Sequence, residues 1–303
     1  MTVMTDFQKK ISALLPNSQL RFDEPLARHT SFRIGGPAEV MAFPQSADEL
    51  AAMLKVSALL DCKPVILGAG TNVLAPDAGI PGLIICLKDA LNGMEQLDAN
   101  TIRVMAGVTM TRAAVYAANL GLSGLEFAHG IPGTVGGGVY MNAGAYGGEI
   151  CQVCKQAAVM DMNGDVSLLS SDEMGFSYRR SRLEEEPGIV LYADFSLTPK
   201  PAEQIKAHMQ ELMVKRKTSQ PLEYPSAGSA FKRPVGGYAA ALIDQAGLKG
   251  FRVGGAAVSQ KHAGFVVNLG NATAADVVDL LGKVSDIVYQ DSGIRLEPEV
   301  RIW

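Results

Sequence analysis

Residues 129–148, HGIPGTVGGGVYMNAGAYGG, constrain the fold most, because eight of them are glycine and none is Asp, Glu, Lys or Arg. Glycine loses the most conformational entropy on folding, so a dense cluster indicates a main chain that needs positive φ or lies close to a ligand. Successive bare amides can bind an anion, usually phosphate. A flexible linker is the alternative, but linkers are polar, and Ile131, Pro132 and Val135 interrupt these glycines. The stretch therefore predicts a buried, ligand-facing backbone.

Size and composition indicate a globular protein with more than one domain. The chain has 303 residues, which exceeds the usual size of one hydrophobic core, and 48% of them are hydrophobic, which excludes disorder. The net charge of −4 and the lack of a Lys/Arg-rich block argue against a nucleic-acid partner. We find no signal peptide and no apolar run long enough to span a membrane. We therefore expect a cytoplasmic protein with no membrane partner, and a monomer is favoured.

Cysteines and histidines predict neither a metal site nor a disulfide framework. Cys151 and Cys154 form one C-x-x-C, while Cys62 and Cys86 lie far from them in the sequence. A zinc site or redox pair needs a further motif that the sequence lacks, and the four histidines have no ligand-like spacing. We expect free thiols, as in a reducing compartment, and no metal.

The hydrophobic pattern predicts a mixture of helices and strands. Asn163-Gly164-Asp165 between two apolar runs is a strong hairpin signal. Ser46 and Glu49 form a capping box before a helix that extends to about residue 60. Further helices are expected at about 6–15, 111–120, 202–219, 237–246 and 273–290. Strands are expected at about 65–67, 83–87, 101–107, 189–197 and 296–303.

A second glycine-rich loop, GAGTNVL, follows a predicted strand at residues 68–74. It departs from the dinucleotide-binding fingerprint, because Val73 stands at the third glycine position and a loop with Pro76 and Gly79 follows where a helix is needed. No stretch matches the phosphate-binding loop of nucleotide hydrolases. Two such loops could hold the two ends of one extended diphosphate ligand.

A series of motifs follows in chain order: HTSFRIGGPA, GAGTNVL, GIPGTVGGGVYMNAGAYGGE, FSYRRS, SAGSAFKRP, AGLKGFRVGGAAVS with KHAGFVVN, and LEPEVR. From about residue 25 to 303 the chain resembles the UDP-N-acetylenolpyruvoylglucosamine reductase (MurB) family of flavoenzymes, in the shorter class that lacks an extra tyrosine-bearing loop. The resemblance implies an α+β fold with a two-part FAD-binding region of the vanillyl-alcohol-oxidase (PCMH) type and a separate α/β substrate-binding domain. It also implies non-covalent FAD, NADPH as reductant, and UDP-GlcNAc-enolpyruvate as the substrate that is reduced to UDP-N-acetylmuramate.

The resemblance also implies domain boundaries. Residues 1–92 would hold the N-terminal helix and the first FAD-binding subdomain. Residues 93–202, together with the C-terminal strand at 295–303, would form the second subdomain. Residues 203–294 would form the substrate-binding domain.

Three residues match the catalytic positions of the family. Arg179 would hold the enolpyruvyl carboxylate and stabilise developing negative charge, because guanidinium is planar, permanently charged and bidentate. Ser229 would donate a proton, which requires neighbouring groups to stabilise its alkoxide. Glu299 would assist the enolic intermediate as a carboxyl group with a raised pKa. From local sequence alone, a solvated arginine cluster, a loop serine and an exposed strand face are the simpler interpretations.

The cofactor and substrate contacts follow from the same matches. Substrate would contact Tyr178, Lys217, Arg233 and Lys261. FAD would contact Gly68, Ala69, Gly70, Thr71, Asn72, Val73, Leu74, Ile131, Pro132, Gly133, Thr134, Gly136, Gly137, Asn142, Ala143 and Gly148. A bulky side chain at Gly136 or Gly137 should therefore weaken FAD binding before it destabilises the fold.

Two other functions remain open from the sequence. The first is another flavin oxidoreductase of the same fold, such as an oxidase of a small alcohol or sugar. The second is a nucleotide-sugar or flavin-binding protein without catalytic activity.

Overall fold

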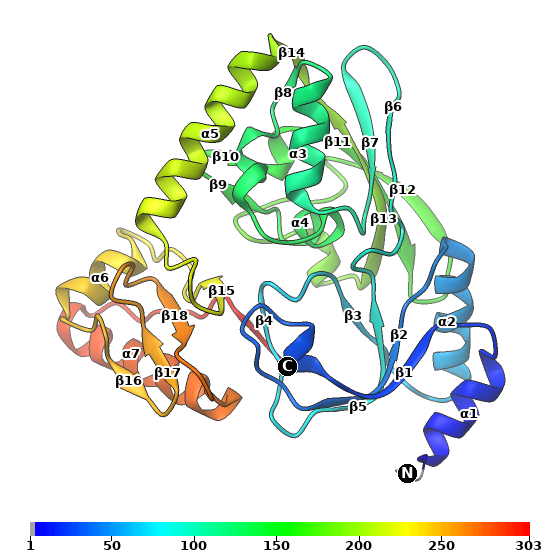
Figure 1. The fold of residues 1–303 in the computed structure, drawn as a ribbon, viewed down its shortest axis with the longest axis horizontal. Coiled ribbons are helices and arrows are strands. Elements are labelled where there is room, and N and C mark those ends of the chain that lie inside the picture. The colour runs from blue at the N-terminus through cyan, green and yellow to red at the C-terminus, as the bar shows by residue number, and fades with distance from the viewer. Residues whose placement is uncertain (1–3) are drawn as a thin grey trace. The chain divides into compact units, whose positions relative to one another are not determined.

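The computed structural model describes residues 4–303, which divide into two compact units (Figure 1). Unit 1 consists of residues 4–22, Val40–Ala69 and Gly82–Lys215. Unit 2 consists of Asp23–Glu39, Gly70–Pro81 and Arg216–Trp303. Two loops of the segment expected to form the first FAD-binding subdomain thus belong to unit 2, and the expected subdomain boundaries stay a prediction.

Most helices begin and end close to their expected positions. Ser46 caps the second helix by accepting a hydrogen bond from the Glu49 amide, and Gly293 ends the last helix in a left-handed conformation. The α-helices are α1 (Asp6–Leu14), α2 (Ala47–Leu59), α3 (Met110–Asn119), α4 (Val135–Tyr140), α5 (Ala202–Ser219), α6 (Ala239–Gln245) and α7 (Ala274–Ser292). The 3-10 helices are η1 (Leu26–Arg28), η2 (Glu126–Gly130), η3 (Ile150–Gln152) and η4 (Arg182–Glu184). Among the described residues, every helix is too short or too polar to cross a membrane.

Unit 1 contains a five-stranded antiparallel sheet in the order β12-β11-β13-β7-β6 (Figure 1). Ala157 and Val159 of the second strand point into a core shared with α3 and α4, whereas Ala158 and Met160 point into a core shared with α1 and α2. Successive strand residues face opposite sides, so this alternation buries both faces of the sheet. The strands are β6 (Met94–Gln96), β7 (Thr101–Met105), β11 (Cys154–Asp161), β12 (Val166–Ser170) and β13 (Gly188–Ser196).

The hairpin expected at Asn163-Gly164-Asp165 is confirmed. It joins β11 to β12, and Gly164 adopts a φ of 94°, which glycine tolerates better than any other residue.

A second sheet has the order β1-β2-β5-β3, and Leu83 and Ile85 of this sheet pack with Met53 of α2. Its strands are β1 (Leu20–Pro25), β2 (Pro37–Ala42), β3 (Val65–Leu67) and β5 (Ile80–Cys86). Short strand pairs are β8 (Leu122–Ser123) with β14 (Thr198–Pro199), and β9 (Gly144–Ala145) with β10 (Gly148–Glu149).

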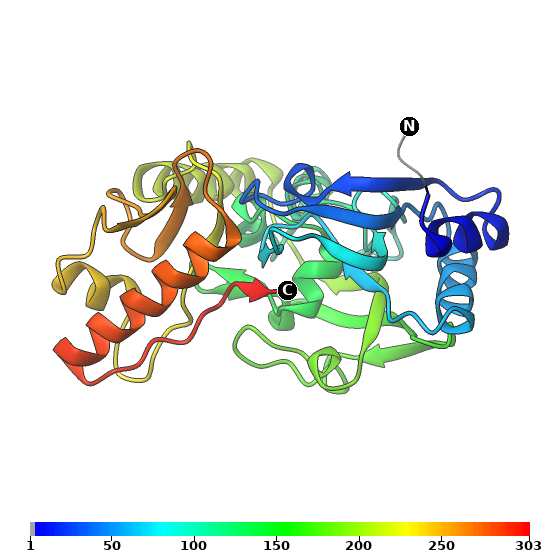
Figure 2. The same ribbon diagram turned by 90° about the horizontal axis from the view of Figure 1, so that it is seen from below.

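Unit 2 is a small sheet packed against α7, as Figure 2 shows. Val277, Leu280 and Val284 of α7 are fully buried in its core. The core also contains Phe32 and Leu74, which come from the two N-terminal loops of the unit. Burial of these apolar side chains thus ties the loops to the C-terminal part of the chain. The sheet has the order β15-β18-β17-β16, with β15 (Ser226–Ser229), β16 (Arg252–Val253), β17 (Ala256–Val258) and β18 (Phe265–Asn268).

The C-terminal strand differs from its expected form. The strand expected over residues 296–303 is limited to β19 (Arg301–Ile302), and it pairs in parallel with β4 (Val73–Leu74) of unit 2. The resemblance implies one subdomain for this strand and residues 93–202, which belong to unit 1. The strand is short because the preceding segment bonds elsewhere: the Glu299 amide donates to the Ala230 carbonyl.

Candidate active site

The two glycine-rich loops meet within unit 1. A Cβ atom added at Gly68 would lie 2.7 Å from Thr134 Oγ1, so the backbone of the GAGTNVL loop lies against a side chain of the 129–148 stretch. Only glycine allows this approach without a shift of Thr134. Thr134 is buried and also caps α4, since its Oγ1 accepts a hydrogen bond from the Gly137 amide. The structure therefore brings together two loops that are 66 residues apart in sequence.

The glycines of α4 have different surroundings. The Gly136 amide donates to the Ala106 carbonyl at 2.9 Å, and the Val135 amide donates to the Val108 carbonyl at 2.8 Å. These two amides are therefore not available to a cofactor, and contact of FAD with the rest of Gly136 stays a prediction. Gly137 is exposed, and a Cβ atom there would meet only Thr134 Oγ1, at 3.6 Å. Gly137 is therefore the α4 glycine that faces open space.

Asn142 is buried within unit 1. It is 1% exposed, and its amide nitrogen donates to Glu149 Oε2 at 3.1 Å and to the Ser177 carbonyl at 3.0 Å. Its amide oxygen accepts a hydrogen bond from the Cys151 amide. Both amide hydrogens of Asn142 are thus bonded within unit 1, and its expected contact with FAD stays a prediction.

Two further residues that are expected to contact FAD, Ala143 and Gly148, also make contacts inside the protein. The Ala143 amide donates to the Gly138 carbonyl, and its own carbonyl accepts from the Ile150 amide. A Cβ atom at Gly148 would lie 2.6 Å from the Phe127 ring, so this glycine packs under an aromatic side chain. Both residues therefore stabilise the conformation of the glycine-rich stretch through contacts within unit 1.

Other groups of unit 1 fit a bound flavin nucleotide. The Ala69 amide donates no hydrogen bond to any described residue. His129 Nδ1 is buried and has no hydrogen-bond partner in the described chain, and burial lowers the pKa of this imidazole below its usual 6.5. Gly133 has a φ of 140°, Ile131 is half-buried and Pro132 is exposed. An open glycine surface beside unsatisfied polar groups is what a nucleotide cofactor requires.

The C-x-x-C pair is not suited to redox chemistry. Burial raises the pKa of the Cys151 thiol, and burial raises the pKa of the Cys154 thiol to about 12. The thiolate is the reactive form, so both groups stay protonated near neutral pH. All four cysteines are free, as expected. Within residues 4–303, no three Cys, His, Asp or Glu side chains gather as metal ligands would.

Residues 70–74 of the GAGTNVL loop lie in unit 2. The Gly70 carbonyl accepts hydrogen bonds from the Ser31 amide and, at 3.4 Å, from its hydroxyl. Asn72 Nδ2 donates to the Glu299 carbonyl at 3.3 Å. Thr71 is half-buried, and β4 (Val73–Leu74) pairs with the C-terminal strand. The loop is therefore joined directly to the segment that carries the expected catalytic glutamate.

Ser229 and Glu299 lie on neighbouring segments of unit 2. The Glu299 amide donates to the Ala230 carbonyl at 2.9 Å, and Phe231 pairs with Pro298 in an antiparallel bridge. Ser229 is exposed and follows Gly228, which has a φ of 77° and lies where the register of β15 shifts between Ser226 and Ser229. The two expected catalytic residues are thus brought together although 70 positions separate them.

Arg179 occupies a tight turn of unit 1. Ser177 and Arg180 exchange two backbone hydrogen bonds, and Arg179 at the turn has a φ of 57°. The Arg179 guanidinium donates to the Gly144 carbonyl at 2.9 Å and lies over the Tyr178 ring.

The neighbouring arginines belong to ion pairs on the surface. Arg180 pairs with Glu184 and Glu185, and Arg182 pairs with Glu186. The solvated-cluster interpretation therefore applies to these two residues, whereas Arg179 is half-buried and its guanidinium is directed to a main-chain carbonyl.

The expected substrate contacts are exposed polar side chains. Tyr178 is 50% exposed at the arginine turn. In unit 2, Lys261 Nζ donates to the Lys217 carbonyl at 2.6 Å, which joins the C-terminal end of α5 to the loop before β18. Arg233 lies over the Tyr238 ring at 4.3 Å. Each of these side chains is accessible, and their contacts with substrate stay a prediction.

Comparison with known proteins identifies the family. Residues 38–170 match the model of an FAD-binding domain, and residues 220–303 match the model of the UDP-N-acetylenolpyruvoylglucosamine reductase C-terminal domain. The UDP-N-acetylenolpyruvoylglucosamine reductase of Agathobacter rectalis is 46% identical, with 98% of each chain covered. The protein of the same name from Caldanaerobacter subterraneus subsp. tengcongensis is also 46% identical, over 97% of this chain and 96% of its own.

The chain belongs to the UDP-N-acetylenolpyruvoylglucosamine reductase family. A crystal structure of this reductase from Thermus caldophilus superposes with a TM-score of 0.79 and 35% identity, over 95% of this chain and 99% of that one. As a member of the reductase family, the chain is an FAD-dependent oxidoreductase with the expected α+β fold, an FAD-binding region and a separate C-terminal domain. The FAD-binding match contains both glycine-rich loops.

Sequence reasoning missed several groups of this family member that hold Arg179. Ser181 is fully buried, and its hydroxyl donates to the Tyr140 carbonyl at 2.8 Å. Ser181 is the last residue of the FSYRRS motif, which indicated that this position matters. The motif does not show whether its hydroxyl is buried or exposed. The Gly144 carbonyl left no signal in the sequence, because backbone acceptors are common to all residues.

Proposed function

We propose that this family member reduces the enolpyruvyl group of UDP-GlcNAc-enolpyruvate to UDP-N-acetylmuramate, with NADPH as the reductant. The observation that carries the proposal is the near-complete coverage, at 46% identity, of relatives named for this reduction. The free thiols support a place in the reducing cytoplasm. UDP-GlcNAc-enolpyruvate and NADPH are then its small-molecule partners.

The reduction adds a hydride and a proton across the vinyl ether. Bound FAD would supply the hydride chemistry, carrying two electrons from NADPH to the terminal carbon of the enolpyruvyl group. Negative charge then collects on the enolate and its carboxylate, and Arg179 binds this carboxylate through its guanidinium. Two of the guanidinium's neighbours, Arg180 and Arg182, are neutralised by carboxylates and are not assigned a part in this step.

The proton reaches the adjacent carbon from Ser229. The exposed Ser229 hydroxyl and the half-buried Glu299 lie on hydrogen-bonded neighbouring segments, which supports their acting on one substrate atom. Glu299 donates or shares a hydrogen bond with the developing enol, so that Ser229 need not form an alkoxide alone. The product carries one more hydride and one more proton than the substrate, and NADP leaves with two fewer electrons.

Anaerobic measurement of the two half-reactions tests the proposal. The purified protein should be yellow, NADPH should bleach it, and UDP-GlcNAc-enolpyruvate should restore the colour. Ser229→Ala should keep the bleaching rate and slow colour recovery by about 100-fold or more, since a positioned proton donor contributes 10² to 10⁴ in rate. Ser167→Ala, at an exposed serine of β12, is the matched control and should change neither rate.

Two results would contradict the proposal. Flavin that a simple alcohol or sugar reduces and oxygen reoxidises, with a reoxidation rate that UDP-GlcNAc-enolpyruvate does not change, would identify another flavin oxidoreductase. A protein that binds flavin and shows neither half-reaction would be a binding protein. If substrate restores the colour at an unchanged rate in Ser229→Ala, the role of Ser229 is wrong while the reaction stands.

A further inference from the structure

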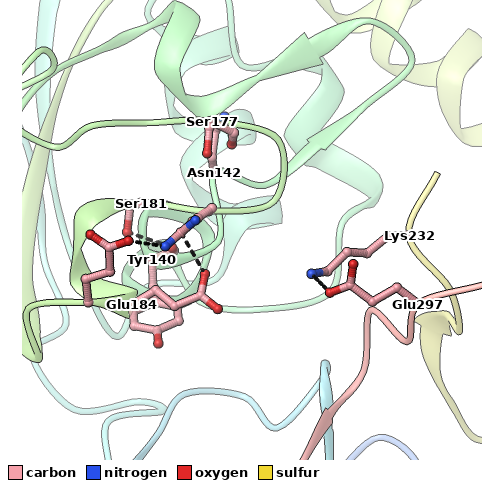
Figure 3. Close-up of polar contacts among 9 residues, drawn as sticks. Tyr140, Asn142, Ser177, Ser181, Glu184, Lys232 and Glu297 are labelled. Atoms are coloured by element: carbon pink, nitrogen blue, oxygen red, sulfur yellow. Dashed lines mark hydrogen bonds and ion pairs between the residues drawn. The ribbon is translucent and has the colours of Figure 1, made fainter. Parts of the chain in front are cut away.

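Three hydrogen bonds join the end of the glycine-rich stretch to the arginine turn, and Figure 3 shows two of the partners on each side. The Ser181 hydroxyl donates to the Tyr140 carbonyl at 2.8 Å. Asn142 Nδ2 donates to the Ser177 carbonyl at 3.0 Å. In addition, the Arg179 guanidinium donates to the Gly144 carbonyl at 2.9 Å. Residues 140–144 therefore contact the turn before, at and after its arginine.

The arginine turn needs such support. A φ of 57° is left-handed, a region that residues with a Cβ atom rarely adopt. Such a conformation persists where the surrounding structure holds it, and it is common at catalytic sites. The two backbone hydrogen bonds between Ser177 and Arg180 close the turn, but they leave its orientation to outside contacts.

Asn142 provides the main outside contact, and its own position is defined. It is 1% exposed, and both its amide oxygen and its amide nitrogen are bonded. The Cys151 amide donates to the side-chain oxygen of Asn142, and Glu149 Oε2 accepts from its nitrogen. Only one of the two possible orientations of the Asn142 amide group satisfies both partners. The second hydrogen of the Asn142 amide nitrogen is then directed at the Ser177 carbonyl.

We propose that Asn142, with Ser181, is a positioning residue that holds the Arg179 turn for the reduction of substrate. The inference rests on the proposed function, because it requires Arg179 to bind the enolpyruvyl carboxylate. Asn142 acts through Arg179 and does not touch the substrate, since it is 1% exposed and both of its amide hydrogens are already bonded. The hydrogen bonds also couple the flavin-binding stretch to the catalytic arginine within one unit.

The half-reactions separate this role from general structural damage. In Asn142→Ala, NADPH should bleach the holoenzyme at a rate within about twofold of wild type, because Arg179 has no assigned part in that step. Recovery of the colour with UDP-GlcNAc-enolpyruvate should slow by about 100-fold, since a misplacement of about 1 Å can cost this much. Asn100→Ala, at an exposed asparagine whose side chain makes no hydrogen bond with the described residues, is the matched control and should change neither rate.

A double-mutant comparison tests whether the effect passes through Arg179. Arg179→Ala should slow colour recovery, and adding Asn142→Ala to it should slow recovery by less than about twofold more. Independent, multiplying effects of the two changes would overturn the inference. If Arg179→Ala leaves recovery unchanged, the assigned role of Arg179 in the proposed function fails; if it slows recovery while Asn142→Ala does not, only the positioning role fails.

Ser181→Ala provides a second variant with a smaller structural change. It removes one hydroxyl and its bond to the Tyr140 carbonyl, and leaves the Asn142 contacts in place. Its colour recovery should slow by about tenfold, with no further loss in the Arg179→Ala background. Should Asn142→Ala not fold or not retain FAD, this variant decides, and unchanged recovery in Ser181→Ala would then overturn the inference.

Discussion

Gly136 lies directly against Ala106 in unit 1. Its amide donates to the Ala106 carbonyl at 2.9 Å, and a Cβ atom added at Gly136 would lie 2.9 Å from Ala106 Cβ. Because such a short contact requires the backbone to shift, Gly136→Ala should destabilise the apoprotein by about 1–3 kcal/mol, the usual cost of overpacking. Urea unfolding of the FAD-free protein measures this. Unchanged apoprotein stability with weakened FAD binding would support the sequence-based expectation instead.

Gly137→Ala should have the opposite effect. The position is exposed, its φ is not left-handed, and its nearest neighbour would be 3.6 Å away. Alanine in a helix gains about 0.4–1 kcal/mol over glycine through the unfolded chain, so the apoprotein should be as stable as wild type or more stable. The FAD dissociation constant should rise about tenfold, because the new methyl group occupies the open surface, and 1.4 kcal/mol corresponds to a factor of ten. A fluorescence titration with FAD would show whether it does.

The comparison of these two glycines shows what the sequence could predict. Glycine density predicted a ligand-facing stretch, and local patterns predicted the 163–165 hairpin, the caps and most helices, because these depend on residues a few positions apart. Which glycine packs and which faces a ligand depends on Ala106, about 30 positions away. The same limit explains Asn142: a polar residue in a motif can serve a ligand or a buried turn, and only the partners distinguish them.

Long-range pairing was the other limit. The C-terminal strand was expected over residues 296–303 and in one subdomain with residues 93–202, but it is limited to Arg301–Ile302 and pairs with β4 (Val73–Leu74) in unit 2. A strand of two residues contains no periodicity, so its partner could not be read from its sequence. The resemblance assigned Ser229 and Glu299 to one reaction, and these catalytic roles stay a prediction; the hydrogen bond that joins their segments, from the Glu299 amide to the Ala230 carbonyl, has no local signature in the sequence.

Asp77 should stabilise unit 2 by capping α7. Asp77 Oδ1 accepts from the Ala274 amide at 2.8 Å and Oδ2 accepts from the Ala275 amide at 3.1 Å, so the loop after β4 satisfies two free amides of the first helical turn. Asp77→Ala should lower the free energy of unfolding by about 1–2 kcal/mol, as loss of a helix cap does. Asp291→Ala, near the C-terminal end of the same helix, should be neutral or slightly stabilising because a negative charge is unfavourable there. Equal losses in both variants would contradict a capping role.

Asp194 should be the most costly acidic residue of unit 1 to replace. It is 1% exposed and accepts two hydrogen bonds from Arg103, at 2.7 and 2.9 Å, and one from Gln156. Asp194→Asn should destabilise the protein by about 3 kcal/mol, at the lower end for a broken buried pair because the Arg103 side chain keeps 28% exposure. Glu95→Gln removes an exposed carboxylate 3.9 Å from the same guanidinium and should cost under about 0.5 kcal/mol.

The pH dependence of Asp194→Asn provides a second test. Burial raises the pKa of Asp194, but the hydrogen bonds from Arg103 and Gln156 outweigh it and lower the pKa below 3.8. A lowered carboxyl pKa stabilises the fold above the unfolded pKa, and this stability is lost as pH falls through the folded pKa. Urea unfolding should therefore give a constant difference between wild type and variant from pH 7 to 5 and a smaller one below about pH 4. A difference that stays constant to the lowest pH would contradict the ionised pair.

His262 should make unit 2 less stable in mild acid. The Gly264 amide donates to His262 Nδ1 at 3.1 Å, and burial lowers the pKa of the imidazole below 6.5. A lowered histidine pKa contributes stability in full above 6.5, and the contribution is lost as pH falls from 6.5 through the folded pKa. His262→Asn keeps an acceptor near the Nδ1 position and does not titrate, so the slope of unfolding free energy between pH 5 and 7 should decrease. The slope should not vanish, because the pKa of His129 is lowered in the same sense.

His262→Asn should also lower the free energy of unfolding by the same amount at every pH, a constant offset in addition to the change in its pH dependence. His262 packs edge-on against the Phe265 ring at 5.0 Å, and loss of the ring should cost about 0.5–1.5 kcal/mol at every pH. The control is His208→Asn, at an exposed histidine beside Glu211, which should leave both slope and offset nearly unchanged. If His262→Asn shows the offset but keeps the wild-type slope, then protonation of His262 is not what weakens the fold in acid.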